Sequence, residues 1–342
     1  MEVNVYDRVP EGFLETGFRD FERVLSGPSL IRLTGRANPP LLLATLLHGN
    51  EPTGLMAVQK LLRSYRDEGE TLPRSLHIFV GNPRAATRNL RHLPDQDDFN
   101  RIWDGGEGPE HQMAEELKRL VLGRGLFASI DIHNTSGENP HYGCVNRIDS
   151  QCIQLASLFS RKLIYFTRPK GVFSSALAEY CPSVTIESGL PNDPYGLPHV
   201  YSFLRRVVSL DAIPRRAREE DGLEVFHSIA SIQVPGESRI GFGEQMDGFD
   251  FCFIDHIDKK NFSEMPANAL LGWRRNPALG LRVIDENGRD VAEDFLAYQG
   301  SEIRLKRSVV PSMFTVDARI VHQDCLGYFM ERYELPPFSP SG

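Results

Sequence analysis

Short apolar runs alternate with amphipathic stretches from residue 29 to about residue 210, and this alternation leaves few fold classes open. The apolar runs predict strands at residues 29–35, 40–49, 75–81, 126–133, 162–167 and 183–188. Between them, apolar side chains recur at three- and four-residue spacing, as in helices packed on a sheet, over residues 53–68, 109–123, 150–162 and 196–211. We therefore expect an α/β fold with a mixed, twisted sheet and helices on both faces.

The pattern changes after residue 212. A Pro-led, charge-dense stretch, "AIPRRAREEDG", is followed by short strand-like pieces that Gly, Pro, Asn and Asp separate. These pieces are residues 224–234, 250–257, 280–286, 301–307 and 313–321. We predict a larger α/β domain over residues 1–212 and a smaller, β-rich domain over residues 213–342.

The charge and cysteine content of the chain limit which binding partners and which cellular compartment are expected. The 38 Lys and Arg residues stand against 46 Asp and Glu residues, and no sustained basic run occurs, so nucleic acid is not an expected partner. Five cysteines without a C-x-x-C pair indicate neither a disulfide framework nor a thiolate zinc site. With no signal-peptide pattern and no apolar run near the roughly 20 residues of a membrane span, we expect a cytoplasmic chain without membrane contact. A homo-oligomer stays open.

Polar side chains end three of the predicted strands. His48 and Glu51 follow "LLLATLL", Asp131 and His133 end "LFASIDIH", and Glu187 ends "SVTIE". Ligands of open α/β sheets bind beyond the carboxyl ends of strands. The H-x-x-E spacing can aim a nitrogen and a carboxylate oxygen at one point, and His133 is the natural third ligand of a zinc ion. Asp131 precedes His133 by two residues and so faces the same side, where it would orient the site.

Each of these motifs also has an ordinary structural interpretation. H-x-x-E is a short pattern that also occurs in polar turns, Asp-x-His-Asn fits an Asx turn, and Glu187 fits a helix cap or an ion pair. Their joint occurrence at three strand ends favours the metal site. Arginines in residues 81–103 add groups that hold carboxylates or stabilise an oxyanion, although a solvated basic loop fits the same composition.

Five motifs, "HGNE", "GNPRA", "DDFNR", "DIHN" and "TIESG", occur in this order between residue 41 and about residue 190. Together they resemble the succinylglutamate desuccinylase/aspartoacylase family, a branch of the zinc carboxypeptidase superfamily. The resemblance implies a zinc carboxypeptidase-like fold for residues 1–212 and one Zn²⁺ per chain, bound by His48, Glu51 and His133. It also implies that Glu187 is the general base and acid.

The same resemblance implies residues that contact the substrate. Arg91 would polarise the scissile carbonyl and stabilise the oxyanion, while Asn100 and Arg101 would hold the free carboxylate of an amino-acid moiety. Asn134 matches the "HN" of the family and would line the same pocket. Tyr298 is our candidate for the tyrosine that the family supplies from its second domain.

The chain departs from the family's pattern in two places. The stretch between Arg91 and Asn100 is two residues longer than the usual pattern, which leaves Arg88 as the alternative arginine. Aspartoacylases carry an arginine ahead of the catalytic glutamate, and alignment on Tyr180 places Ser175 at that position. This difference argues against N-acetylaspartate as the substrate.

The sequence thus predicts a zinc-dependent amidohydrolase that removes an acyl group from an N-acylated amino acid or a related small amide. One alternative is a zinc carboxypeptidase that acts on short peptides or γ-glutamyl-type tails, since those substrates also present a carboxylate beside the scissile amide. Another is a binding protein that keeps the pocket without catalysis, although such a chain should first lose Glu187 or a ligand. Zinc, cobalt and manganese all stay open as the native metal.

Overall fold

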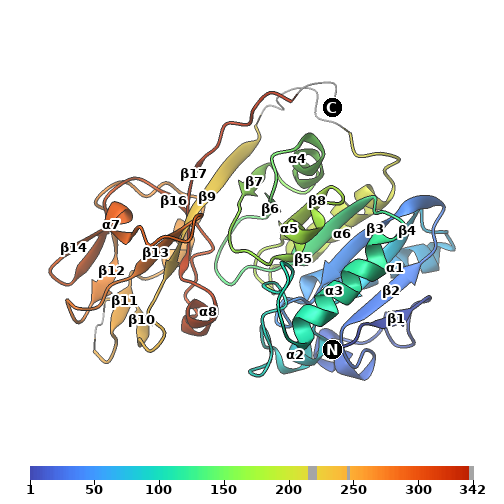
Figure 1. The fold of residues 1–342 in the computed structure, drawn as a ribbon, viewed down its shortest axis with the longest axis horizontal. Coiled ribbons are helices and arrows are strands. Elements are labelled where there is room, and N and C mark those ends of the chain that lie inside the picture. The colour runs from blue at the N-terminus through green and yellow to red at the C-terminus, as the bar shows by residue number, and fades with distance from the viewer. Residues whose placement is uncertain (215–221, 245–246, 339–342) are drawn as a thin grey trace. The chain divides into compact units, whose positions relative to one another are not determined.

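The computed structural model describes residues 1–214, 222–244 and 247–338, which form two compact units (Figure 1). Apart from the residues outside those ranges, the first unit comprises Met1–Asn134, His141–Glu224 and Leu335–Gly342. The second unit comprises Thr135–Pro140 and Val225–Glu334. The second unit therefore includes a short segment from the middle of the chain as well as most of its C-terminal third.

The first unit is built on a mixed sheet with the strand order β1-β2-β4-β3-β5-β8-β6-β7. Its strands are β1 (Asn4–Tyr6), β2 (Ser29–Leu33), β3 (Ala37–Thr45), β4 (Arg74–Val80), β5 (Ala128–His133), β6 (Tyr142–Val145), β7 (Lys162–Tyr165) and β8 (Ser183–Glu187). The central strands β4, β3, β5 and β8 run parallel, whereas β2 and β6 are antiparallel to β4 and β8. The carboxyl ends of β3, β5 and β8 therefore meet at one edge.

Helices cover both faces of this sheet. They are α1 (Thr53–Glu68), α2 (Pro83–Arg88), α3 (Pro109–Leu122), α4 (Ser150–Ser157), α5 (Phe173–Leu177) and α6 (Gly196–Val208), with a 3₁₀ helix at Phe18–Arg23. Helices α3 and α5 share a buried core with Ala44 of β3, and α1 approaches the neighbouring residue Thr45. Because successive side chains of a strand point to opposite faces, these helices lie on opposite sides of the sheet. The predicted α/β architecture is confirmed.

The second unit is rich in strands. Strand β9 (Glu224–Gln233) pairs with β13 (Arg282–Asp285) and with β17 (Gly327–Arg332), which in turn pairs with β16 (Val310–Ser312). A second sheet has the order β10 (Ile240–Phe242), β11 (Phe251–Phe253), β12 (Leu270–Arg274), β15 (Glu302–Leu305) and β14 (Leu296–Gln299). Short helices lie at Ile257–Lys260, α7 (Ala292–Phe295) and α8 (Ala318–Gln323). The expected β-rich C-terminal part is confirmed.

Several local predictions need correction. The strand predicted over residues 40–49 ends at Thr45, because Leu46 takes a left-handed φ, and the strand predicted over residues 250–257 is limited to Phe251–Phe253. Residues 313–321 are not a strand, because Met313 takes a left-handed φ of 60° directly after β16 and Asp317 then caps α8 by accepting a hydrogen bond from the Arg319 N–H. The helix predicted over residues 150–162 ends earlier, at Ser157. All five cysteines are free and buried. In the described part of the chain, no helix combines the length and the apolar character that a membrane crossing requires.

Gly54 allows α1 to pack closely on the sheet, and this contact gives a test of the fold. A Cβ atom at Gly54 would lie 2.6 Å from Thr45 Oγ1 and 2.9 Å from Ile132 Cβ. We expect Gly54→Ala to lower the free energy of unfolding by about 1–3 kcal/mol, because the helix must move away from β3 and β5. Urea unfolding followed by circular dichroism measures this change.

Gly17→Ala is the matched control for this experiment. Gly17 has a φ of -70°, and a Cβ atom there would meet nothing within 4 Å. This variant should stay within about 0.5 kcal/mol of the parent protein. Equal stability of the Gly54→Ala protein and the parent would contradict the close packing of α1.

Candidate metal centre

A tight turn after β3 delivers His48 to the edge of the sheet. Leu46 has a left-handed φ of 52°, and its carbonyl accepts a hydrogen bond of 2.7 Å from the Asn82 N–H. Gly49 lies so close to α2 that a Cβ atom there would be 2.2 Å from the Ala86 nitrogen. The turn is therefore held against the start of α2, and glycine is the residue that this close approach permits.

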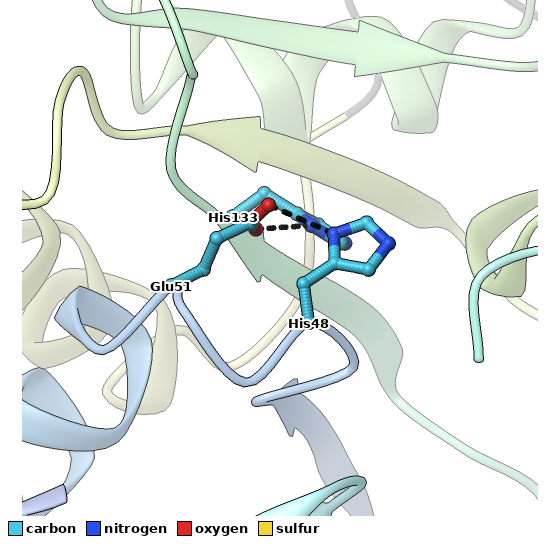
Figure 2. A group of neighbouring side chains, drawn as sticks. All are labelled: His48, Glu51 and His133. Carbon is cyan, nitrogen blue, oxygen red and sulfur yellow. Dashed lines mark hydrogen bonds and ion pairs between the residues drawn. The ribbon is translucent and has the colours of Figure 1, made fainter. Parts of the chain in front are cut away.

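His48, Glu51 and His133 converge at the ends of β3 and β5 (Figure 2). His48 Nδ1 lies 2.8 Å from Glu51 Oε1, and His133 Nδ1 lies 2.7 Å from Glu51 Oε2. One possible ligand atom of each residue lies within 4.8 Å of the others. The three residues are only 3%, 8% and 3% exposed, respectively. The structure thus brings together the three side chains that the sequence predicts as metal ligands.

Each imidazole is also held from behind by a carboxylate. His133 Nε2 lies 2.8 Å from Asp131 Oδ2, as the two-residue spacing on β5 predicts. His48 Nε2 lies 3.0 Å from Asp98 Oδ1. A carboxylate that accepts the Nε2–H leaves the Nδ1 lone pair of a neutral imidazole directed at the centre of the group. Both histidines are therefore oriented with Nδ1 inward.

Asp98 is the site residue that the sequence analysis missed. Besides His48, it contacts Arg91, whose Nε lies 2.8 Å from Asp98 Oδ2, and its Oδ1 accepts a 2.7 Å hydrogen bond from the Asn100 N–H. The available signal was its place in the motif "DDFNR", where we considered only the asparagine and the arginine. Asp98 ties Arg91 and the backbone of Asn100 to the histidine, whereas Arg88 is exposed at the end of α2.

Asn100, Arg101 and Asn134, which the resemblance assigns to the substrate, all have hydrogen-bond partners within the protein. The Asn100 Oδ1 accepts a 2.9 Å hydrogen bond from the Phe173 N–H, and Arg101 is half-buried with its Nη1 2.8 Å from the Asn100 carbonyl oxygen. Asn134 is 3% exposed, and its backbone N–H donates to Glu51 Oε2 at 3.1 Å. Because Asn100 Nδ2 also lies 3.4 Å from His133 Nε2, both asparagines are next to proposed ligands.

Tyr298 and Ser175 have contacts of a different kind. The hydroxyl of Tyr298 accepts a 2.9 Å hydrogen bond from the Leu281 N–H, and the Arg274 guanidinium lies 3.8 Å from its ring centroid. These contacts lie within the second unit. Ser175 is exposed on α5 in the first unit.

Glu187 lies at the end of β8, opposite His133 of β5 in the strand register. Burial raises the pKa of Glu187 to about 8, and the negative charges of Glu51 and Asp131 add to this effect, while His133 opposes it. Its Oε2 is buried and has no hydrogen-bond partner among the described residues. Glu187 can therefore hold a proton near neutral pH, as a general acid and base must.

The pKa values of the proposed ligands Glu51 and His133 are shifted so that each side chain favours its charged form. Burial alone would raise the pKa of Glu51, but His48 and His133 lower it far below its usual value. Burial likewise lowers the pKa of His133, yet Asp131 and Glu51 raise it well above its usual value. Two carboxylates in one site thus have pKa values that their surroundings push in opposite directions. Glu51 stays ionised, whereas Glu187 can exchange a proton.

The donor set fits a zinc ion. Two imidazole nitrogens and one carboxylate are the ligands of many catalytic zinc sites, which keep a further position for water or substrate. The buried carboxylates of Glu51 and Asp131 and the half-buried carboxylate of Asp98 concentrate negative charge around the group. A divalent cation would compensate this charge.

Comparison with known proteins shows which family part of the chain is similar to. Residues 37–189 match the model of the succinylglutamate desuccinylase/aspartoacylase catalytic domain. The chain is similar to the succinylglutamate desuccinylase of Pseudomonas aeruginosa (strain LESB58), with 25% identity over 258 residues that cover 68% of this chain and 73% of that protein. The matched family region contains all three side chains of the candidate metal centre and Glu187.

Solved structures share the fold. The succinylglutamate desuccinylase from Chromobacterium violaceum has a TM-score of 0.56 at 19% identity, covering 88% of this chain and 87% of that one. Murine aminoacylase 3 has a TM-score of 0.52 at 15% identity, covering 87% of this chain and 97% of that one. Residues 37–189 thus resemble the catalytic domain of the succinylglutamate desuccinylase/aspartoacylase family, and the solved structures show that the chain shares its fold.

Proposed function

We propose that the protein is a zinc-dependent amidohydrolase that removes an acyl group from an N-acylated amino acid or a related small amide. The observation that carries this proposal is the buried His48–Glu51–His133 group with Glu187 opposite His133. The names desuccinylase and aminoacylase, given to similar proteins, denote the release of an acyl group and support the same reaction class.

The proposed reaction divides the work between the metal and the side chains. His48, Glu51 and His133 would hold one Zn²⁺, which as a Lewis acid polarises a carbonyl and lowers the pKa of water. Glu187 takes a proton from the water that attacks the amide carbon and gives a proton to the departing nitrogen. The C–N bond breaks, and the products are a carboxylate and an amine.

Arg91, Asn100 and Arg101 would position the substrate. Asp98 holds the Arg91 guanidinium by its Nε and also contacts His48, so that one carboxylate links the arginine to a proposed ligand. Arg91 would stabilise the negative charge that develops on the carbonyl oxygen. Arg101 and Asn100 would bind a free carboxylate of the substrate, since a guanidinium matches carboxylate geometry. The burial of Arg91 and the exposure of Arg88 support this assignment.

The side chain at position 175 bears on the choice of substrate. Ser175 offers no positive charge where aspartoacylases carry an arginine, so the proposal disfavours N-acetylaspartate. Ser175 is exposed and lies with Lys118 and Tyr180 in a cavity of about 340 Å³ in the first unit. N-acyl amino acids other than N-acetylaspartate are therefore the substrates to examine first.

Glu187→Gln tests the proposed reaction. The amide cannot take a proton from water, so we expect turnover to fall by at least about 100-fold while one zinc per chain is retained. Release of amine from a panel of N-acetyl, N-succinyl and longer N-acyl amino acids, beside dipeptides and γ-glutamyl peptides, measures the activity. Elemental analysis of the same samples measures the zinc.

Glu70→Gln is the matched control, because Glu70 is an exposed glutamate of the same unit, just after α1. This variant should keep the activity of the parent protein. Undiminished turnover of Glu187→Gln would contradict the role of Glu187. Turnover of dipeptides alone would favour the carboxypeptidase alternative, and a parent protein that binds zinc without any turnover would favour the binding protein.

Arg91→Lys tests the arginine assignment. A lysine cannot keep both the contact with Asp98 and a guanidinium directed at the carbonyl oxygen, so we expect kcat to fall about 10- to 100-fold with a smaller change in KM. Arg88→Lys, at an exposed position three residues away, should leave both constants unchanged. The reverse result, with kcat lost in the Arg88 variant alone, would transfer the role to Arg88.

A further inference from the structure

The carboxamide of Asn134 lies where three segments of the first unit meet. Asn134 itself ends the segment of β5, Thr53 begins α1, and Ser188 and Gly189 follow β8 directly. Each segment supplies one residue of the proposed site: His133, Glu51 and Glu187. The side chain of Asn134 therefore contacts the segment that carries Glu51 and the segment that carries Glu187, and Asn134 itself directly follows His133.

The hydrogen bonds of this carboxamide are directed entirely at the protein. Its Oδ1 accepts the Thr53 N–H at 3.2 Å. Its Nδ2 lies 2.9 Å from Thr53 Oγ1, 3.0 Å from Ser188 Oγ and 2.9 Å from the Gly189 carbonyl oxygen. Three acceptors therefore share the two N–H groups of an amide that is 3% exposed. No donor is left over for a substrate.

The network continues from Asn134 to two of the proposed ligands. Ser188 Oγ donates a 2.7 Å hydrogen bond to the His133 carbonyl oxygen, and the Ser188 N–H donates to the same oxygen at 3.0 Å. The Asn134 backbone N–H donates to Glu51 Oε2. A change in the Asn134 side chain thus reaches His133 through Ser188 and reaches Glu51 through the Asn134 backbone.

We propose that Asn134 is a positioning residue, which holds the ends of β5 and β8 and the start of α1 at the spacing that zinc binding and proton transfer require, and does not contact the substrate. This inference rests on the proposed zinc site. A catalytic group must be held within about 0.5 Å of its productive position. Without the carboxamide, the Thr53 N–H and the Gly189 carbonyl oxygen lose a buried partner, and the three segments lose their common contact.

Zinc affinity tests this proposal without reference to turnover. We expect Asn134→Ala to weaken zinc binding about tenfold or more, as loss of groups that orient ligands does, measured by competition with a chromogenic chelator. In the zinc-loaded protein, kcat should fall while KM changes little. A residue that contacts the substrate would show the opposite pattern, with a raised KM and unchanged zinc affinity.

Gln59→Ala is the matched control for a general loss of stability. Gln59 is a buried carboxamide of α1, 5% exposed, whose Nε2 donates to the carbonyl oxygens of Phe13 and Thr16 at 2.7 and 2.9 Å. Its removal also breaks one buried and one partly buried hydrogen bond, but at a distance from the three segment ends. We expect a lower midpoint of thermal unfolding and an unchanged zinc affinity.

Ser188→Ala provides a second variant, which decides the question if Asn134→Ala does not fold. It removes one acceptor of Asn134 and the hydroxyl contact with His133, so zinc affinity should fall in the same direction by a smaller factor. Parent zinc affinity in Ser188→Ala and in a folded Asn134→Ala protein would overturn the proposal. A parent protein that binds no zinc would instead contradict the proposed function itself.

Discussion

Glu51 lies between two buried imidazoles, and the geometry of the candidate site depends on this contact. The Nδ1 atoms of His48 and His133 both face its carboxylate, at 2.8 and 2.7 Å. Asp98 and Asp131 hold the opposite nitrogens, so neither ring can turn away without losing a buried hydrogen bond. These two ring nitrogens and this carboxylate together are the donor set of many catalytic zinc sites.

The fold supplies this arrangement by bringing the carboxyl ends of three parallel strands to one edge. The turn after β3 carries His48, β5 ends in His133, and β8 ends in Glu187. The same edge separates the roles of the two glutamates. Glu51 lies between two imidazoles and stays ionised, whereas burial near other carboxylates raises the pKa of Glu187. One carboxylate can therefore bind a metal while its neighbour transfers a proton.

Much of this account follows from sequence pattern, because strand ends and helix periodicity are local. The apolar run before His48 and the spacing of Asp131 and His133 predict a convergence that the structure contains. The contact of Asp98 with His48 joins residues 50 positions apart, so no local pattern reveals it. Asn134 was assigned to the substrate pocket by resemblance, whereas its amide bonds depend on two segments distant in sequence. Residues 313–321 have the apolar pattern of a strand, but Asp317 caps a helix there, and the segment continues as α8.

Anomalous scattering at the zinc absorption edge, from crystals grown with zinc, tests the central claim most directly. We expect one strong peak at the ends of β3 and β5, about 2.0–2.2 Å from His48 Nδ1, His133 Nδ1 and an oxygen of Glu51. A peak at another place, or the lack of any peak in a protein supplied with zinc, would contradict the account. In that case His48 and Glu51 would form only the polar turn that their short motif also permits.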